Sequence, residues 1–287
     1  MTLSSISFCC VLKDEEEYIN ELINSVEKIS VTLKDYELIF VDDFSKDNTF
    51  ELLKSYKDKN PNIKIIRNPF PGKVSGTNEA LKLCTKNYVK FIDGDDMICG
   101  DFSTLPEKFE CLYHDYHELK KVEKKYVTIG NWLAKSPELI RNDFRSIPKA
   151  MFIFKRSYIE EYFPIPKSLP FEDLWINFIA SKAKDLKYKN KSFYVYRQHS
   201  NQFYGSHSNF NHSKRIRMGN RFRSYYEYLS NNEHPFKFKP SANIKYYSDV
   251  LLRKNLFNII KLIKHPRLLI KSILYNFPFL IKFIWNK

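Results

Sequence analysis

The chain has 287 residues, of which 43% are hydrophobic and 16% are aromatic. This length suits one large α/β domain or one domain with an appendage, and the hydrophobic content excludes a generally disordered chain. The 47 Lys and Arg residues outnumber the 33 Asp and Glu residues, which gives a net charge of +14. Such a charge predicts attraction to a polyanion, for example nucleic acid, an anionic membrane surface or a phosphorylated substrate.

The cysteines favour a reducing compartment. They are odd in number and lack the spacing of a metal site, so they are expected to be buried thiols; they are Cys9, Cys10, Cys84, Cys99 and Cys111. The apolar run 6–12 is too short for a secretory signal, and acidic residues follow it. The longest uncharged apolar stretches fall below the roughly 18 residues of a membrane-spanning helix. A cytoplasmic protein is therefore expected.

Segments typical of strands and helices alternate through the first hundred residues. Strands are expected at 6–12, 37–41, 63–66 and 88–92, and helices at 16–29, 49–57 and 74–83. Alternation with short links predicts an α/β fold with a mostly parallel sheet flanked by helices. The carboxyl ends of parallel strands then lie along one edge of the sheet, where open α/β folds bind ligands.

The pattern is weaker between residues 100 and 200. Strands are expected at 126–129, 150–154 and 193–196, and a helix at 173–184. The segment 208–239 is polar and aromatic and contains an arginine cluster, which comprises Arg215, Arg217, Arg221 and Arg223.

Two carboxylates follow the strand expected at 37–41. Asp42 and Asp43 repel each other unless a group donates to them, so the N–H of a nucleotide base is a reasonable partner. The polar residues from Ser45 to Thr49 are better explained as a turn that caps the next helix.

Three carboxylates follow the strand expected at 88–92. Asp93, Asp95 and Asp96 are costly together without a counter-charge, and Mg²⁺ or Mn²⁺ is held by carboxylates together with substrate phosphate. Such an ion stabilises a departing nucleoside diphosphate. The alternative is a solvated acidic turn in which Gly94 has a positive φ, and this segment alone leaves both open.

The order of six motifs favours a metal and diphosphate site over a solvated acidic turn. The chain resembles the family 2 glycosyltransferases of GT-A fold over about residues 4 to 200. The motifs are the turn 12–15, V-D-D-x-S-x-D-x-T at 41–49, the glycine-containing helix 72–80, D-x-D-D at 93–96, E-D at 172–173 and Y-R-x-H at 196–199. The resemblance implies a GT-A catalytic domain over residues 1–205 and a separate helical, basic region over 206–287.

The resemblance also implies roles for the acidic residues. Asp43, with Asp42 nearby, would recognise the base, usually uracil, and Asp93 would lie near the ribose. Either Asp95 or Asp96 would hold the metal ion and the diphosphate, since family members differ on this point.

The remaining implied roles concern the acceptor and the phosphates. Asp173 would be the general base that deprotonates the acceptor hydroxyl, and Glu172 would orient it. Arg197 would donate to the diphosphate, and His199 would donate to it or bind the metal ion. Lys73, close to Gly72, ranks lower as a phosphate ligand.

The implied activity is transfer of one sugar from a UDP-sugar to a hydroxyl of a glycan or lipid-linked acceptor, with inversion and with Mn²⁺ or Mg²⁺. The processive, membrane-embedded branch of the family has a Q-x-x-R-W motif after the E-D pair, which this sequence lacks. The expected setting is bacterial capsule or lipopolysaccharide synthesis, and the oligomeric state stays open.

Two other classes of function make different predictions. A nucleotidyltransferase predicts a glycine-rich phosphate loop near the first strand, and residues 6–17 contain no glycine. A nucleic-acid-binding protein predicts basic and aromatic residues interleaved on the main domain. The positive charge is instead concentrated in 208–239 and in the tail, so we expect no nucleic-acid partner.

The tail after Val250 has eight basic residues and no acidic residue. Lys254, Asn258, Lys261 and His265 repeat at helical spacing among Leu, Ile and Phe residues. A proline then interrupts the pattern, which resumes over 268–274 and ends with aromatic residues over 278–285. This predicts interfacial helices that bind an anionic membrane through 250–287. The alternative is a helix pair packed on the catalytic domain or in a dimer interface.

Overall fold

The structure is a computed structural model that describes residues 5–120, 125–129, 147–199, 212–231, 242–254 and 257–262, and the single positions 269, 273 and 276. The chain divides into two compact units. The first unit comprises Met1–Lys167 and Glu172–Asn201, and the second comprises Ser168–Phe171 and Gln202–Lys287. The assignment of residues 1–205 as a catalytic domain and of 206–287 as a basic appendage stays a prediction.

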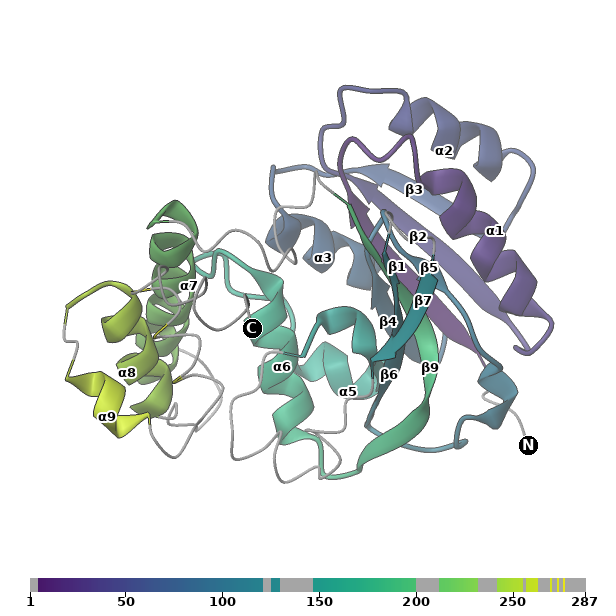
Figure 1. The fold of residues 1–287 in the computed structure, drawn as a ribbon. Coiled ribbons are helices and arrows are strands. Elements are labelled where there is room, and N and C mark those ends of the chain that lie inside the picture. Colours follow the sequence, from purple (N-terminus) through teal and green to yellow (C-terminus); the bar gives the residue numbers. More distant parts are fainter. Residues whose placement is uncertain are drawn as a thin grey trace. The chain divides into compact units, whose positions relative to one another are not determined.

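The first unit begins with the expected alternation of strands and helices (Figure 1). The strands are β1 (Ile6–Leu12), β2 (Tyr36–Asp42), β3 (Ile63–Arg67) and β4 (Tyr88–Ile92). The helices between them are α1 (Ile19–Ser30), α2 (Thr49–Lys57) and α3 (Lys73–Lys82). The first helix starts three residues later than expected, because the backbone N–H groups of Asp14, Glu15 and Glu16 donate to side chains of the β2–α2 loop and of the first residue of α2.

The sheet is mixed rather than mostly parallel. Among the described residues it has nine strands in the order β3-β2-β1-β4-β8-β6-β9-β5, with β7 paired to β6. The pairs among β1 to β4 are parallel, and β4 pairs antiparallel with β8. The later strands are β5 (Met97–Ile98), β6 (Cys111–Lys120), β7 (Lys125–Ile129), β8 (Phe152–Lys155) and β9 (Leu186–Gln198), and the later helices are α5 (Arg156–Ile159) and α6 (Glu172–Lys182).

The strand expected at 150–154 starts later, because Lys149–Met151 forms a 3₁₀ turn, η3, after Pro148. The turn is closed by a hydrogen bond from the Met151 N–H to the Pro148 carbonyl. Strand β6 has no counterpart among the expected strands, and β9 is much longer than the expected segment 193–196.

The strand order reverses between β1 and β4. The chain moves from β1 to β2 and β3 on one side and then crosses back to place β4 on the other side of β1. Because such crossovers are right-handed, α1 and α2 cover one face of the sheet and α3 covers the other, as Figure 1 shows. A crevice forms at such a reversal, outside the carboxyl ends of the strands. The loops that follow Leu12 and Ile92 therefore border the expected ligand site.

Helix α3 packs very closely on β1, at Gly76. All seven residues of β1 are buried. A Cβ atom at Gly76 would lie 2.5 Å from Cγ1 of Val11, so only glycine allows this approach. The glycine of the motif therefore has a packing reason for its position.

The second unit contains α7 (His212–Ser230), α8 (Ala242–Leu251) and α9 (Asn258–Lys261). The prediction of one helix through Lys254, Asn258 and Lys261 is wrong. Helix α8 ends in a Schellman motif, in which Lys254 N–H donates to Asp249 and Arg253 N–H donates to Val250. Arg253 takes the required positive φ of 55°.

The expected polar stripe is also wrong at Asn258. This side chain is buried and donates to Asp249, whereas Phe257 and Ile260 are exposed. His265, the proline break and the elements expected at 268–274 and 278–285 lie outside the described residues, apart from single positions. Within the parts of the chain that the structure describes, no helix is long and apolar enough to cross a membrane.

We expect Gly76→Ala to lower the free energy of unfolding by about 1–3 kcal/mol, because the added methyl group overlaps the buried Val11 side chain. Chemical denaturation followed by circular dichroism measures this loss. In Val11→Ala/Gly76→Ala the space is restored, so the double variant should be more stable than the sum of the single changes. The packing explanation would be contradicted if the stability loss of the double variant equalled the sum of the two single losses within about 0.5 kcal/mol.

Candidate active site

The acidic loop after β4 contacts two lysines. Asp93 Oδ1 accepts hydrogen bonds from Lys149 Nζ at 2.6 Å and from Lys73 Nζ at 3.2 Å. Burial tends to raise the pKa of Asp93, but Lys149 and Lys73 outweigh burial and hold that pKa well below its usual range. Asp93 is therefore a carboxylate at neutral pH, and two positive charges already surround it.

Asp95 and His199 form the pair that best fits a metal ion. His199 Nε2 lies 3.0 Å from Asp95 Oδ2, and the histidine ring packs against Tyr18 with ring centres 5.0 Å apart. The side chains of His199 and Asp95 are only 7% and 17% exposed. Imidazole nitrogen and carboxylate oxygen are both ligands for Mn²⁺-type ions. Among the described residues, no three His, Cys, Asp or Glu side chains converge on one such point.

Asp96 is held by β9 instead. Its Oδ2 accepts from the Tyr194 hydroxyl at 2.7 Å and its Oδ1 accepts from the Arg197 backbone N–H at 2.7 Å. Burial, with the charges of Asp95 and Asp93, raises the pKa of Asp96 well above its usual value. The Tyr194 hydroxyl also accepts from Asp93 N–H, so the Asp96 carboxyl helps to shape the loop.

Arg197 joins the acidic loop to α1. Its Nε donates to the Asp95 carbonyl oxygen at 2.8 Å, and its guanidinium pairs with Glu21. The guanidinium also lies over the Tyr18 ring, 4.9 Å from the ring centre. These contacts hold the chain that carries Asp95 in place.

The structure separates Asp42 from Asp43. Asp43 Oδ1 accepts from Asn68 Nδ2 at 2.7 Å and from Gly72 N–H at 2.8 Å, which fixes the entry to α3. Asp42 is buried, and its two oxygens have no hydrogen-bond partner among the described residues. The guanidinium of Arg67 lies 3.4 Å from Asp42. A carboxylate enclosed in this way is not accessible to a ligand, whereas Asp43 is partly exposed.

The E-D pair begins α6. Glu172 is buried, and its Oε1 accepts from Lys149 Nζ at 2.9 Å. Burial opposes the charge on Glu172, but Lys149 and Lys73 hold its pKa below the usual value. Asp173, the next residue, is partly exposed. Acids in the first turn of a helix are also stabilised by the helix dipole.

Two residues at this site had no role in the sequence prediction. Lys149 bridges Asp93 and Glu172, and nothing in its local sequence marks it. Glu15 lies over the acidic loop, since its Cγ would be 3.0 Å from a Cβ atom at Gly94. Burial, with the charges of Asp95 and Asp93, raises the pKa of Glu15 to about 8. The acidic turn 12–15 could have signalled Glu15, because it follows β1 at the same edge.

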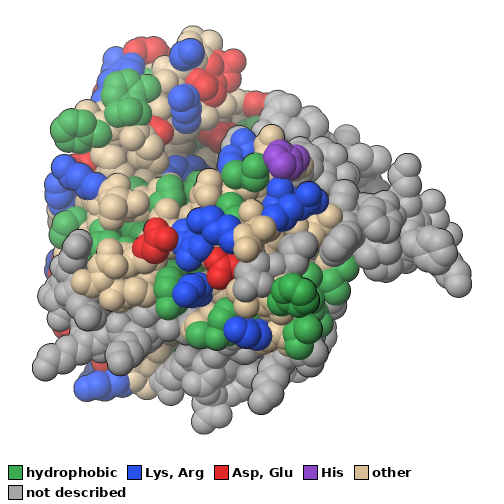
Figure 2. All heavy atoms as spheres, turned by 90° about the vertical axis from the view of Figure 1, so that its left-hand side faces the viewer, with side chains coloured by type: hydrophobic (Ala, Val, Ile, Leu, Met, Phe, Trp, Pro, Cys, Tyr) green, Lys and Arg blue, Asp and Glu red, His purple; other side chains and the backbone are tan. Residues whose placement is uncertain are grey.

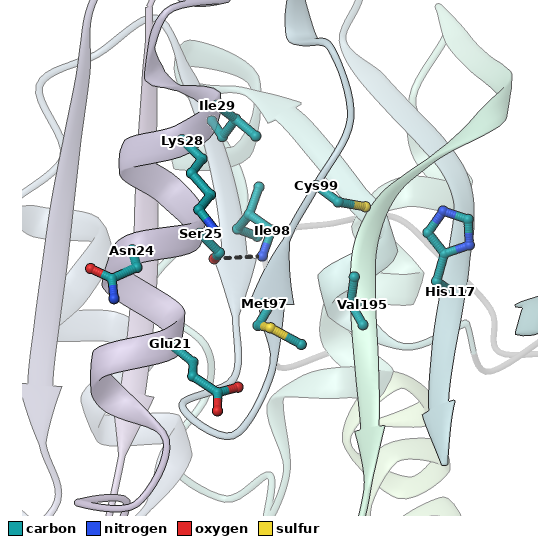
Figure 3. Close-up of a pocket in the computed structure, with 10 residues that line it drawn as sticks. All are labelled: Glu21, Asn24, Ser25, Lys28, Ile29, Met97, Ile98, Cys99, His117 and Val195. Carbon is teal, nitrogen blue, oxygen red and sulfur yellow. Dashed lines mark hydrogen bonds between the residues drawn. The ribbon is translucent and has the colours of Figure 1, made fainter. Parts of the chain in front are cut away.

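A separate groove of about 520 Å³ lies between α1 and β5 (Figure 3). Met97, Ile98 and Val195 supply much of its apolar lining, and Glu21 and Lys28 of α1 line it as well. None of the predicted site residues lines it.

The described basic side chains do not gather into one large patch on the face seen in Figure 2, where Lys and Arg stand in small groups among Asp and Glu. In the second unit, much of the arginine cluster is internal. Arg215 donates to the Leu251 carbonyl oxygen, Arg221 stacks on Phe171, and Arg223 pairs with Asp249 at 2.6 Å. These arginines therefore cap and join the helices of their own unit.

Comparison with known proteins shows which enzymes part of this chain resembles. Residues 7–103 match the family described as Glycosyl transferase family 2. A poly(ribitol-phosphate) beta-glucosyltransferase of Bacillus spizizenii is 29% identical over 149 residues, which cover 51% of this chain and 21% of that protein. The poly(ribitol-phosphate) beta-N-acetylglucosaminyltransferase TarS of Staphylococcus aureus is 34% identical over 86 residues, which cover 30% of this chain and 15% of TarS. The matched segments are thus small parts of these relatives.

Solved structures show the same fold. TarS residues 1–349 in complex with UDP align with a TM-score of 0.54 at 18% identity, covering 86% of this chain and 79% of that one. A Pyrobaculum calidifontis mannosyltransferase in complex with GDP-Man and Mn²⁺ aligns with a TM-score of 0.57 at 14% identity, covering 98% and 87%. Residues 7–103 are therefore similar to glycosyltransferase family 2, and the chain has the GT-A fold of these solved structures.

We expect Glu15→Gln to change how stability depends on pH. The folded-state pKa of about 8 lies above the ordinary value of 4.5, so the folded chain retains a proton that the unfolded chain releases. This contribution to stability is complete below about pH 4.5 and is lost as the pH rises toward 8. Glutamine cannot ionise, so Glu15→Gln should gain stability relative to the wild type across that window.

Thermal melts at several pH values, in metal-free buffer with a chelator, measure this difference. Exposed Glu51→Gln is the matched control and should follow the wild type. Parallel curves for all three proteins would show that Glu15 keeps an ordinary pKa.

Proposed function

We propose that this chain transfers a single sugar from a nucleotide-sugar, with a UDP-sugar as the expected donor, to a hydroxyl of a glycan or lipid-linked acceptor. The observation that carries the proposal is the arrangement of carboxylates on two sides of Lys149. The acidic loop after β4 lies on one side and the E-D pair of α6 lies on the other. A displacement with inversion needs a base beside the acceptor and stabilisation of charge on the opposite, leaving-group side.

The donor side is formed by the ends of β2 and β4. Asp43, which is partly exposed beside the buried Asp42, takes the base-recognition role, and it also holds the entry to α3. The half-exposed Lys73 can leave Asp93 and bind the diphosphate of the donor. Support for a nucleotide donor comes from relatives of the same fold, since TarS was solved with UDP and the mannosyltransferase with GDP-Man.

Asp95 and His199 are the proposed metal ligands. Their atoms are 3.0 Å apart and partly buried. A carboxylate oxygen suits Mn²⁺ and Mg²⁺ together with phosphate oxygens, and the imidazole nitrogen favours Mn²⁺ of the two. A divalent cation bound there would neutralise the charge that develops on the leaving diphosphate. Asp96, whose oxygens are used by β9, supports the loop rather than the ion.

Asp173 is the proposed general base. It follows the buried Glu172 at the start of α6 and is exposed enough for an acceptor hydroxyl to reach. Its carboxylate takes the proton of that hydroxyl as the oxygen attacks the anomeric carbon, and the bond to the diphosphate breaks. Glu172 fixes the first turn of the helix through its pair with Lys149.

We expect Asp95→Asn and Asp173→Asn to affect different steps. Asp95→Asn should lower donor hydrolysis about 100-fold and weaken its dependence on Mn²⁺, because it removes a proposed metal ligand. Asp173→Asn should lower sugar transfer about 100- to 10,000-fold through loss of the base, but it should leave UDP binding near the wild-type value. A panel of UDP- and GDP-sugars, with and without Mn²⁺, identifies the donor first.

Exposed Asp58→Asn serves as the control and should behave as the wild type. Wild-type transfer by either active-site variant, with folding intact, would overturn that residue's assignment. Hydrolysis of none of the nucleotide-sugars by the wild type would overturn the proposed activity itself.

We propose in addition that the tail associates with the anionic inner surface of the cell membrane, where surface polysaccharides are assembled on lipid carriers. The predicted helix is interrupted, but Phe257 and Ile260 are 83% and 64% exposed, close in sequence to the exposed Lys254 and Lys261. Apolar side chains beside lysines favour binding at an anionic membrane interface.

We expect Phe257→Ser/Ile260→Ser to reduce binding to phosphatidylglycerol vesicles by about tenfold or more, because each exposed apolar side chain loses its transfer to the interface. Co-sedimentation measures the bound fraction. Val31→Ser is the matched control, since Val31 is 86% exposed in the first unit. Equal binding by the double variant and the wild type would exclude this part of the tail as the membrane contact.

A further inference from the structure

We propose that Lys149 is a positioning residue that couples the donor side of the site to the acceptor side. The inference rests on the proposed function, because that function defines the two sides. Lys149 Nζ is 2.6 Å from Asp93 Oδ1 and 2.9 Å from Glu172 Oε1. One ammonium group thus links the end of β4 to the start of α6.

The two lysines on Asp93 differ in freedom. The side chain of Lys73 is 53% exposed, whereas that of Lys149 is only 7% exposed. A half-exposed lysine can leave Asp93 to meet a phosphate. A buried one that is paired with two carboxylates stays in place, because moving it leaves charges without partners. Lys149 is therefore suited to hold groups rather than to bind the donor.

The backbone that carries Lys149 is fixed from both sides. Asn177 of α6 binds both backbone groups of Ile147, accepting from its N–H at 2.9 Å and donating to its carbonyl oxygen at 2.7 Å. On the other side, the buried Lys90 of β4 donates to the Ala150 carbonyl oxygen. The segment around Lys149 is thus attached to the same two elements that its side chain bridges.

These contacts determine where Asp173 lies. Glu172 is paired with Lys149, and Asn177 also donates to the Asp173 carbonyl oxygen at 2.8 Å. The first turn of α6 is therefore held at both its acidic side chain and its backbone. Loss of Lys149 should release Glu172 and misplace the adjacent base. The effect on the nucleotide should be smaller, because Asp93 keeps its contact with Lys73.

Steady-state kinetics with the UDP-sugar that the wild type uses, and calorimetric titration with UDP and Mn²⁺, test this role. Lys149→Met should lower kcat for transfer about 30- to 100-fold, because a small misplacement of a reacting group is costly. Its donor KM and UDP affinity should stay within about threefold of the wild type, because the change affects the transition state and not the binding of the donor. Lys149→Arg should recover part of the lost kcat.

Lys64→Met is the matched control, because Lys64 Nζ pairs at 2.7 Å with Glu37, another buried glutamate of the first unit. It should retain the wild-type kcat. Because Lys149 acts through Glu172, Lys149→Met/Glu172→Gln should be no slower than Glu172→Gln alone.

Three results would overturn the role of Lys149: an unchanged kcat, a parallel loss of kcat and UDP binding in a folded variant, or losses that multiply in the double variant. If circular dichroism shows that Lys149→Met is unfolded, Lys149→Arg replaces it in the test. A lower kcat with an unchanged donor KM in Lys149→Arg then supports the role, and an unchanged kcat overturns it. Failure of the proposed function is distinguishable, because the wild type would then turn over no nucleotide-sugar.

Discussion

The site depends on the balance of charge around Asp93. Burial alone would drive Asp93 and Glu172 toward their neutral forms, since charged groups lose hydration inside a protein. The ammonium groups of Lys149 and Lys73 reverse this effect and keep both carboxylates ionised. Glu15 shows the opposite outcome, because the negative charges of Asp95 and Asp93 add to burial and raise its pKa to about 8. Asp93 and Glu15, although close together, thus carry different charges at neutral pH.

The reversal of strand order decides which residues can take part. Because β4 lies beside β1 rather than beyond β3, the loop after β4 lies next to the turn that contains Glu15. The same crossover places the start of α3, and with it Lys73, above Asp93. The turn η3, which leads into the antiparallel strand β8, brings Lys149 to the same oxygen of Asp93. The neighbours of β4 in the fold thus bring two lysines, far apart in sequence, to Asp93.

The sequence predicted the first four strands, three helices and the similarity to family 2 well, because apolar periodicity and motif order are local signals. It could not separate Asp95 from Asp96, since the difference comes from β9, about 100 residues away, which supplies Tyr194 and the Arg197 N–H. Strand β6 was missed because it includes His114 and Asp115, which are buried polar residues with partners on distant segments. The end of α8 was missed because its Schellman motif uses Arg253 where glycine is usual.

The net charge of +14 shows how structure changes a compositional argument. A large positive charge is compatible with any polyanion, but the arginines of α7 contact a helix carbonyl, an aromatic ring and Asp249. Positive charge that is used inside a unit cannot form a groove for a phosphate backbone. Exposed Lys254 and Lys261 instead flank the exposed Phe257 and Ile260. Nucleic-acid backbones offer no apolar surface for those two side chains, whereas a membrane interface accommodates both kinds of group. Among the described residues of the second unit, this arrangement is the reason for proposing a lipid surface rather than nucleic acid.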